Sequence, residues 1–153
     1  MNKIELPNAI REGSVQVLET MFFADTSECT IAHHNDPLAC TLQCSGAETG
    51  SFSIAVDREA LKLLCESFYG ESGDITELQE IDLICELTNM LAGATLSRFA
   101  PFGLSALSSP VLCDVSRHRE IGTAPHVGDE HSQIYISLEG GVLSASCALR
   151  TKA

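Results

Sequence analysis

The sequence is poor in positive charge and lacks long apolar runs. Its 153 residues include 9 Lys plus Arg against 21 Asp plus Glu, a formal net charge of −12. That excess of negative charge repels phosphate backbones and anionic lipids, so we expect no nucleic-acid partner and no membrane partner. No apolar run reaches the roughly 20 residues of a membrane-spanning helix, and residues 1–7 lack the apolar core of a signal peptide. We therefore expect a cytoplasmic location.

Familiar catalytic motifs are also missing. The chain has no Gly-x-Ser-x-Gly elbow, no phosphate-binding loop and no dinucleotide fingerprint. A hydrolase triad assembled from distant residues stays open as an alternative.

A metal or redox protein is a second alternative, because the chain has seven Cys and five His. The closest cysteines, Cys40 and Cys44, would lie about 13 Å apart along a strand, too far to share one ion. We expect no metal site. The seven cysteines are an odd number and lie mostly in apolar runs, so they are expected to pack as small hydrophobic side chains.

The chain is predicted to form one domain over residues 1–153, since no Pro-, Gly- or Ser-rich linker divides it. Apolar periodicity predicts three helices, over residues 8–24, 57–69 and 74–100. Alternation of apolar and polar residues predicts two hairpins and a short strand, over residues 40–56, 131–150 and 111–115. The polar stretch from Ser116 to Glu130 is expected to be a loop.

Local signals predict the ends of these helices. Asp57 can cap the second helix, whose inward face is expected to include Phe68. Asp74 followed by Glu77 resembles a capping box at the start of the long helix, and Pro101 is expected to end it.

The order of elements indicates an α+β fold, an antiparallel or mixed β-sheet with two long helices packed on one face. A helix leading into a hairpin occurs twice. Residues 20–24 align with residues 89–93, which suggests pseudo-duplicated helix-plus-hairpin units.

A polar stripe on the predicted long helix is the strongest functional signal. Asp82, Glu86, Asn89 and Gly93 follow one another at helical spacing between two apolar flanks. A solvated face usually carries basic residues as well, yet no Lys or Arg occurs from the start of this helix to Arg98. Glycine costs about 1 kcal/mol in a helix interior, and in return it allows close approach by another backbone. We interpret the stripe as a docking face that carries chemistry.

The pattern Asp82-x3-Glu86-x2-Asn89 resembles the active-site helix of the CheC, CheX and FliY chemotaxis phosphatases. Members of that family carry an acidic residue or Ser, then Glu, then Asn at this spacing, and a Pro further along, close to the place of Pro110. The 20 residues between Asn89 and Pro110 are slightly fewer than usual in the family.

The first predicted helix bears on the number of active sites. Residues 17–21 resemble the opening helix of CheX in particular. Val17 and Thr20 stand where a second site would need Glu and Asn, and Ala94 follows Gly93 where many relatives have Asn. The resemblance therefore implies a single active site, as in CheX.

The family implies a phosphatase that accelerates hydrolysis of the aspartyl phosphate of a CheY-type response regulator. Such hydrolysis needs a water held in line and little covalent help. A carboxamide suits this task because it donates and accepts hydrogen bonds without becoming charged, so Asn89 is expected to position the water. The resemblance implies that Glu86 pairs with the regulator's lysine. Asp82, Gly93 and Pro110 are expected to contact the partner.

Several further expectations come with the resemblance. Mg²⁺ is expected in the partner regulator, and this chain is expected to need no cofactor of its own. A homodimer joined through sheet edges is implied, with the 131–150 hairpin as a plausible edge. The alternative function is a non-catalytic adaptor of the same fold that binds a response regulator.

Overall fold

Seven strands form one antiparallel sheet in the computed structural model, which describes residues 5–30, 33–46, 48–70, 74–99, 104–123 and 130–151. The strands are β1 (Ser27–Cys29), β2 (Pro37–Gly46), β3 (Glu48–Asp57), β4 (Leu104–Leu107), β5 (Val111–Cys113), β6 (Glu130–Leu138) and β7 (Gly141–Thr151). The helices are α1 (Leu6–Met21), α2 (Arg58–Tyr69), α3 (Glu77–Phe99) and α4 (Val115–Thr123). The sheet order is β1-β6-β7-β3-β2-β4, and β5 also pairs with β2.

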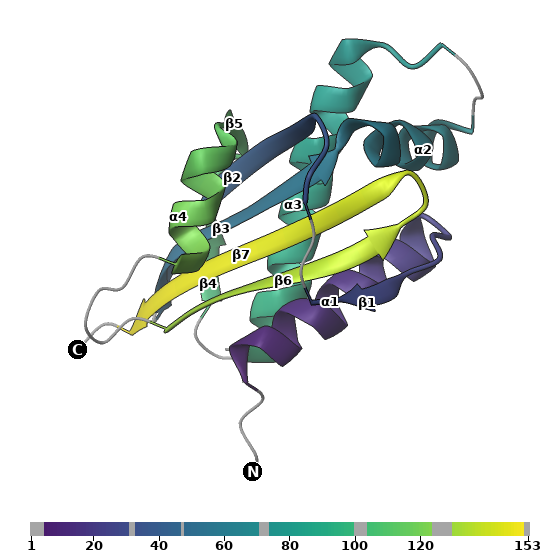
Figure 1. Ribbon diagram of the computed structural model, residues 1–153. Coiled ribbons are helices and arrows are strands. Elements are labelled where there is room, and N and C mark those ends of the chain that lie inside the picture. The colour runs from purple at the N-terminus through teal and green to yellow at the C-terminus, as the bar shows by residue number, and fades with distance from the viewer. Residues whose placement is uncertain are drawn as a thin grey trace.

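The main core lies between the sheet and the two long helices, α1 and α3, as the sequence predicted (Figure 1). Alternate residues of the central strands point into it, among them Phe52, Ile54, Val56, Leu143, Ala145 and Cys147. Four cysteines, Cys40, Cys44, Cys65 and Cys147, are buried and pack as small hydrophobic side chains. The predicted α+β class is confirmed, and every strand pairing among the described residues is antiparallel.

The predicted loop over residues 116–130 is wrong in its first half. Residues 115–123 form α4, which packs on the face of the sheet opposite the main core (Figure 1). Among the residues of α4 whose burial is described, 115–121, only His118 and Ile121 are buried, so the sequence had too weak an apolar pattern to predict this helix. Residues 124–129 lie outside the described part of the chain.

Two helix starts differ from prediction. Thr76 and Gln79, rather than Asp74 and Glu77, form the capping box of α3: Thr76 Oγ1 accepts from Gln79 N at 3.1 Å, and Gln79 Oε1 accepts from Thr76 N at 2.9 Å. Asp57 occupies the N-cap position of α2 but makes no side-chain capping bond. The predicted role of Pro101 lies outside the described residues.

The carboxylate of Asp57 instead ties together segments on either side of β3. It accepts from Asn35 N and Val142 N, each at 2.9 Å, and contacts His34 Nδ1 at 2.8 Å. A tertiary role has therefore replaced the local capping role that the sequence indicated.

The C-terminal hairpin forms as predicted, with Glu139 and Gly140 at its turn. It is not the outermost pair, however, because β1 pairs with residues 135–137 of β6. None of the helices in the described ranges is long and apolar enough to span a membrane.

Two large apolar side chains near helix ends are exposed, and one of them, Phe68, was expected on the inward face of its helix. Phe68 of α2 is 44% exposed, and Met21 at the end of α1 is 53% exposed. Phe68 stacks on the buried ring of Phe22 with the ring centroids 5.7 Å apart, so it covers the core without entering it.

Candidate functional site

The predicted polar stripe lies on the face of α3 turned away from the core. Asp82, Glu86 and Asn89 are exposed, while Leu83 and Leu87 on the opposite face are buried. The apolar face of α3 thus anchors the helix, and its fixed backbone holds three polar side chains in line.

An open groove of about 340 Å³ runs beside this stripe. One wall consists of Asp82, Cys85, Glu86 and Asn89 from α3, and the other consists of Leu107, Ser108, Ser109 and Pro110. The second wall is the end of β4 and the connection from β4 to β5. The fold therefore brings Pro110 to the same groove as the three polar residues of the predicted site.

Hydrogen bonds to β2 hold the second wall in place. Ser108 N donates to Gln43 O at 2.8 Å, and Ser108 Oγ accepts from Gln43 N at 2.8 Å. The chain then reaches β5, where Val111 pairs with Thr41. Since β2 is a central strand of ten residues, the wall is fixed to the sheet at both ends.

Under the groove, α3 contacts β2 through two thiols. The Sγ atoms of Cys85 and Cys40 lie 3.8 Å apart, and Cys85 is half-buried while Cys40 is fully buried. Burial raises the pKa of the Cys40 thiol to about 12, so this thiol stays protonated and packs as an apolar group.

Gly93 lies one turn beyond Asn89 and is not among the residues that line the groove. A β-carbon built on Gly93 would meet no atom of this chain within 4 Å. The fold itself therefore gives no reason for glycine at this position.

The groove offers hydrogen-bond acceptors and no positive charge. Two carboxylates, one carboxamide and two hydroxyls line it, and none of its lining residues is Lys or Arg. A phosphoryl group needs cations around it, so this groove alone is unsuited to bind a free phosphate ester. It suits a partner surface that brings its own cations.

Sequence reasoning missed Cys85, Leu107, Ser108 and Ser109 as groove residues. Ser108 and Ser109 directly precede Pro110, so their proximity to that predicted contact was an available signal. Their position opposite α3 depends on strand pairing across the sheet, which local patterns do not specify.

A second polar cluster resembles a hydrolase triad but is closed to substrate. His34 lies between Asp57 and Ser144, with Nδ1–Oδ1 and Nε2–Oγ distances of 2.8 Å each. Ser144 is fully buried and also contacts His118 of α4. A nucleophile must reach its substrate, so this cluster is a structural link between the sheet and α4.

Within the described ranges, no group of three or more His, Cys, Asp or Glu side chains is arranged to hold a metal ion.

Comparisons with known proteins agree with the fold. The family model described as chemotaxis phosphatase CheX matches residues 38–142. The chain therefore belongs to the CheX family of chemotaxis phosphatases, which confirms the resemblance drawn from the sequence. A search of curated protein sequences finds no match.

Solved structures share this fold at low identity. CheX from Vibrio vulnificus is 20% identical with a TM-score of 0.73, over 97% of this chain and 99% of that one. A chain of the CheX–CheY–BeF3–Mg²⁺ complex from Borrelia burgdorferi is 16% identical with a TM-score of 0.71, over 97% and 99% of the two chains. FliY from Thermotoga maritima is 11% identical with a TM-score of 0.59, over 94% and 86%.

Proposed function

We propose that this protein is a phosphatase that accelerates hydrolysis of the aspartyl phosphate of a CheY-type response regulator. The observation that carries the proposal is the groove that unites Asp82, Glu86, Asn89 and Pro110. Its lack of basic residues supports a macromolecular substrate that supplies its own cations, rather than a free phosphate ester. Membership of the CheX family supports the same activity.

Asn89 is the proposed catalytic residue. It is exposed on a rigid helix, so its carboxamide can enter the active site of a partner without unfolding its own surroundings. There it accepts a hydrogen bond from the attacking water and donates one to a neighbouring oxygen. Holding the water in line lowers the entropic part of the barrier.

Glu86 and Asp82 are the proposed docking residues. Both are exposed carboxylates on the same side of α3 as Asn89. Glu86 pairs with the lysine of the receiver domain and so fixes the depth of insertion, while Asp82 adds attraction one turn away.

Gly93 and Pro110 shape the contact surface. The space around Gly93 lets a partner backbone approach α3 closely. Pro110 is half-buried in the opposite wall and presents a rigid surface to the same partner.

The proposed partner and setting are supported by the family. A relative has been crystallised with CheY, BeF3 and Mg²⁺, which supports a receiver domain as the partner and a Mg²⁺ ion in that complex. We propose that the Mg²⁺ belongs to the receiver and that this chain works as a cytoplasmic homodimer.

The test is loss of phosphate from a phosphorylated receiver, with and without the protein. Asn89→Ala is expected to lower kcat at least 100-fold while the Kd for the receiver stays within about threefold, since the amide acts on the water. Glu86→Ala is expected to raise KM at least tenfold. Glu77→Ala, at the exposed start of α3 and outside the groove, is the matched control.

Two outcomes contradict the proposal. Binding without faster phosphate loss in the unmodified protein would make it an adaptor. Full activity in Asn89→Asp, which replaces the amide by a carboxylate of the same shape, would remove the amide from the mechanism.

A further inference from the structure

A small pocket with apolar side chains and a polar rim lies away from the groove, where α1 ends. It has a volume of about 170 Å³ and is lined by Phe22, Phe23, Leu63, Leu64 and Leu138, with Ala24 and Ala60 between them. Figure 1 shows α2, the end of α1 and the β6–β7 turn gathered at one end of the molecule, away from β4 and β5. A cavity of roughly 150 Å³ accommodates a benzene ring, so this pocket has room for one large apolar side chain.

Phe23 at the rim has an unfavourable conformation for its residue type. Its φ angle is +53°, in the left-handed region where glycine is the usual residue after a helix. Phe23 is 83% exposed, so it also gains little from burial within this chain. Folding alone would favour glycine here. Such a strained and exposed aromatic residue indicates a role in contacts outside the fold.

The neighbouring aromatic residues extend the apolar surface. Phe68 is 44% exposed and stacks on Phe22, which lines the pocket. Ser67 Oγ donates to Phe22 O at 2.7 Å and so fixes α2 against the end of α1. The surface is therefore preformed, which lowers the entropic cost of binding.

The negative charge around the pocket favours a positively charged occupant. Asp25 and Glu139 line it, and none of its lining residues is Lys or Arg. A second copy of a chain with net charge −12 would bring further negative charge to these carboxylates. The apolar area is also small for a stable dimer, which buries on the order of 1,200–2,000 Å².

We propose that this pocket binds a short basic segment of a protein partner through one aliphatic or aromatic anchor side chain. The anchor fills the cavity beside Phe23, and Lys or Arg residues on either side pair with Asp25 and Glu139. The surface is separate from the groove on α3, so one molecule can hold such a segment and a receiver domain together.

The test measures fluorescence anisotropy with the full chain and four labelled nonapeptides at about 0.15 M salt. Three peptides carry Phe, Leu or Met at the centre between alternating Lys and Ser; the fourth carries Ser at the centre and has the same charge. At least one anchored peptide is expected to bind about tenfold more tightly than the Ser peptide. The affinity of that anchored peptide is expected to fall about tenfold in the Phe23→Gly variant. Val111→Ser, which removes an exposed apolar side chain at the other sheet edge, is expected to bind as the unmodified protein does.

Three results would overturn the proposal. Equal binding of the Ser peptide and all anchored peptides would reduce the effect to charge. Unchanged peptide binding in Phe23→Gly would place any binding elsewhere. Dissociation of a dimer by Phe23→Gly, seen by analytical ultracentrifugation, would assign the surface to a second copy of the chain.

Discussion

A β-carbon at Gly13 of α1 would lie 2.9 Å from the backbone nitrogen of Thr95 in α3. The two long helices therefore meet backbone to backbone at this point, and the helix that carries the candidate site rests directly on α1. We predict that Gly13→Ala pushes the helices apart and lowers the free energy of unfolding by about 2 kcal/mol. Chemical denaturation would measure the loss.

Gly93→Ala is the matched variant on α3, because a β-carbon there meets no atom of this chain. It is expected to leave stability unchanged or raise it by up to about 1 kcal/mol, the helix propensity gained. If the proposed docking is correct, it raises KM for the phosphorylated receiver. Unchanged kinetics with this variant would remove Gly93 from the contact.

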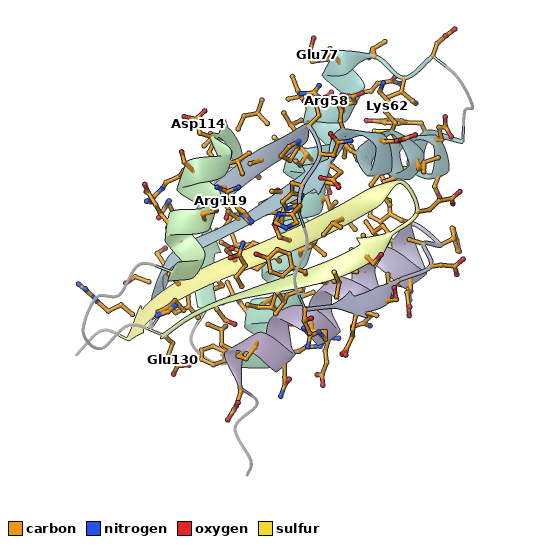
Figure 2. All side chains as sticks on the ribbon, in the orientation of Figure 1. Arg58, Lys62, Glu77, Asp114, Arg119 and Glu130 are labelled. Atoms are coloured by element: carbon orange, nitrogen blue, oxygen red, sulfur yellow. The ribbon has the colours of Figure 1, made fainter. Side chains whose placement is uncertain are left out.

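His118 predicts how stability changes with pH. Burial, together with the smaller effect of the charges of His34 and Arg119, lowers the pKa of His118 to about 4. Arg119 is labelled on α4 in Figure 2. The folded state therefore binds this proton less readily than the unfolded state, whose histidine pKa is about 6.5. Stability is expected to fall as the pH drops from about 6.5 to about 4, by up to about 3 kcal/mol.

The measurement is the denaturation midpoint as a function of pH. His118→Gln is expected to flatten the curve between pH 6.5 and 4, because glutamine does not titrate there and can still bond to Ser53 or Ser144. The same slope in His118→Gln would contradict the assignment.

Because Arg58 and Glu80 form an ion pair, we predict that substitutions at the two positions have non-additive effects on stability. Arg58, labelled in Figure 2, places Nη1 3.2 Å from Oε2 of Glu80, whose side chain is 4% exposed. Arg58→Met leaves a buried carboxylate without its cation and is expected to cost on the order of 2 kcal/mol. Adding Glu80→Met is expected to regain most of that loss, and denaturation of the single and double variants would check it.

A substitution at Ser108 tests whether the groove wall opposite α3 contributes to binding of the receiver. Ser108→Ala removes the acceptor for Gln43 N and loosens the connection that carries Pro110. We expect the KM for the receiver to rise about threefold to tenfold with a smaller change in kcat, because the wall is proposed to contact the partner and not the water. Ser97→Ala, an exposed serine of α3 that does not line the groove, is the control. An equal effect of both variants would contradict a specific role for the wall.

Much of the site was predictable because it lies on one helix. The spacing of Asp82, Glu86 and Asn89 needs only the 3.6-residue repeat to place them on one side of α3. The serines of the opposite wall come from a separate element, and their position depends on pairing between β4, β5 and β2. Such pairing joins residues far apart in sequence, so local patterns do not reveal it.

The misplaced elements have related physical reasons. α4 buries little apolar surface, so helical periodicity over residues 115–123 is weak. β1 and β4 have three and four residues, too short for a clear alternation. Phe68 follows the apolar repeat of α2 but lies at its end, where the helix passes beyond the core it covers.

Because the groove wall is anchored to β2, the distance in space between Asn89 and Pro110 does not depend on their spacing along the sequence. Pro110 is placed by the pairing of Ser108 with Gln43 and of Val111 with Thr41, and not by the length of chain that leads from Asn89. Insertions or deletions before Leu104 are therefore expected to leave the width of the groove unchanged. The distance in space between Asn89 and Pro110 is therefore set by the register of β4 and β5 on β2, and the number of residues between them in the sequence is a consequence of the connecting segment alone.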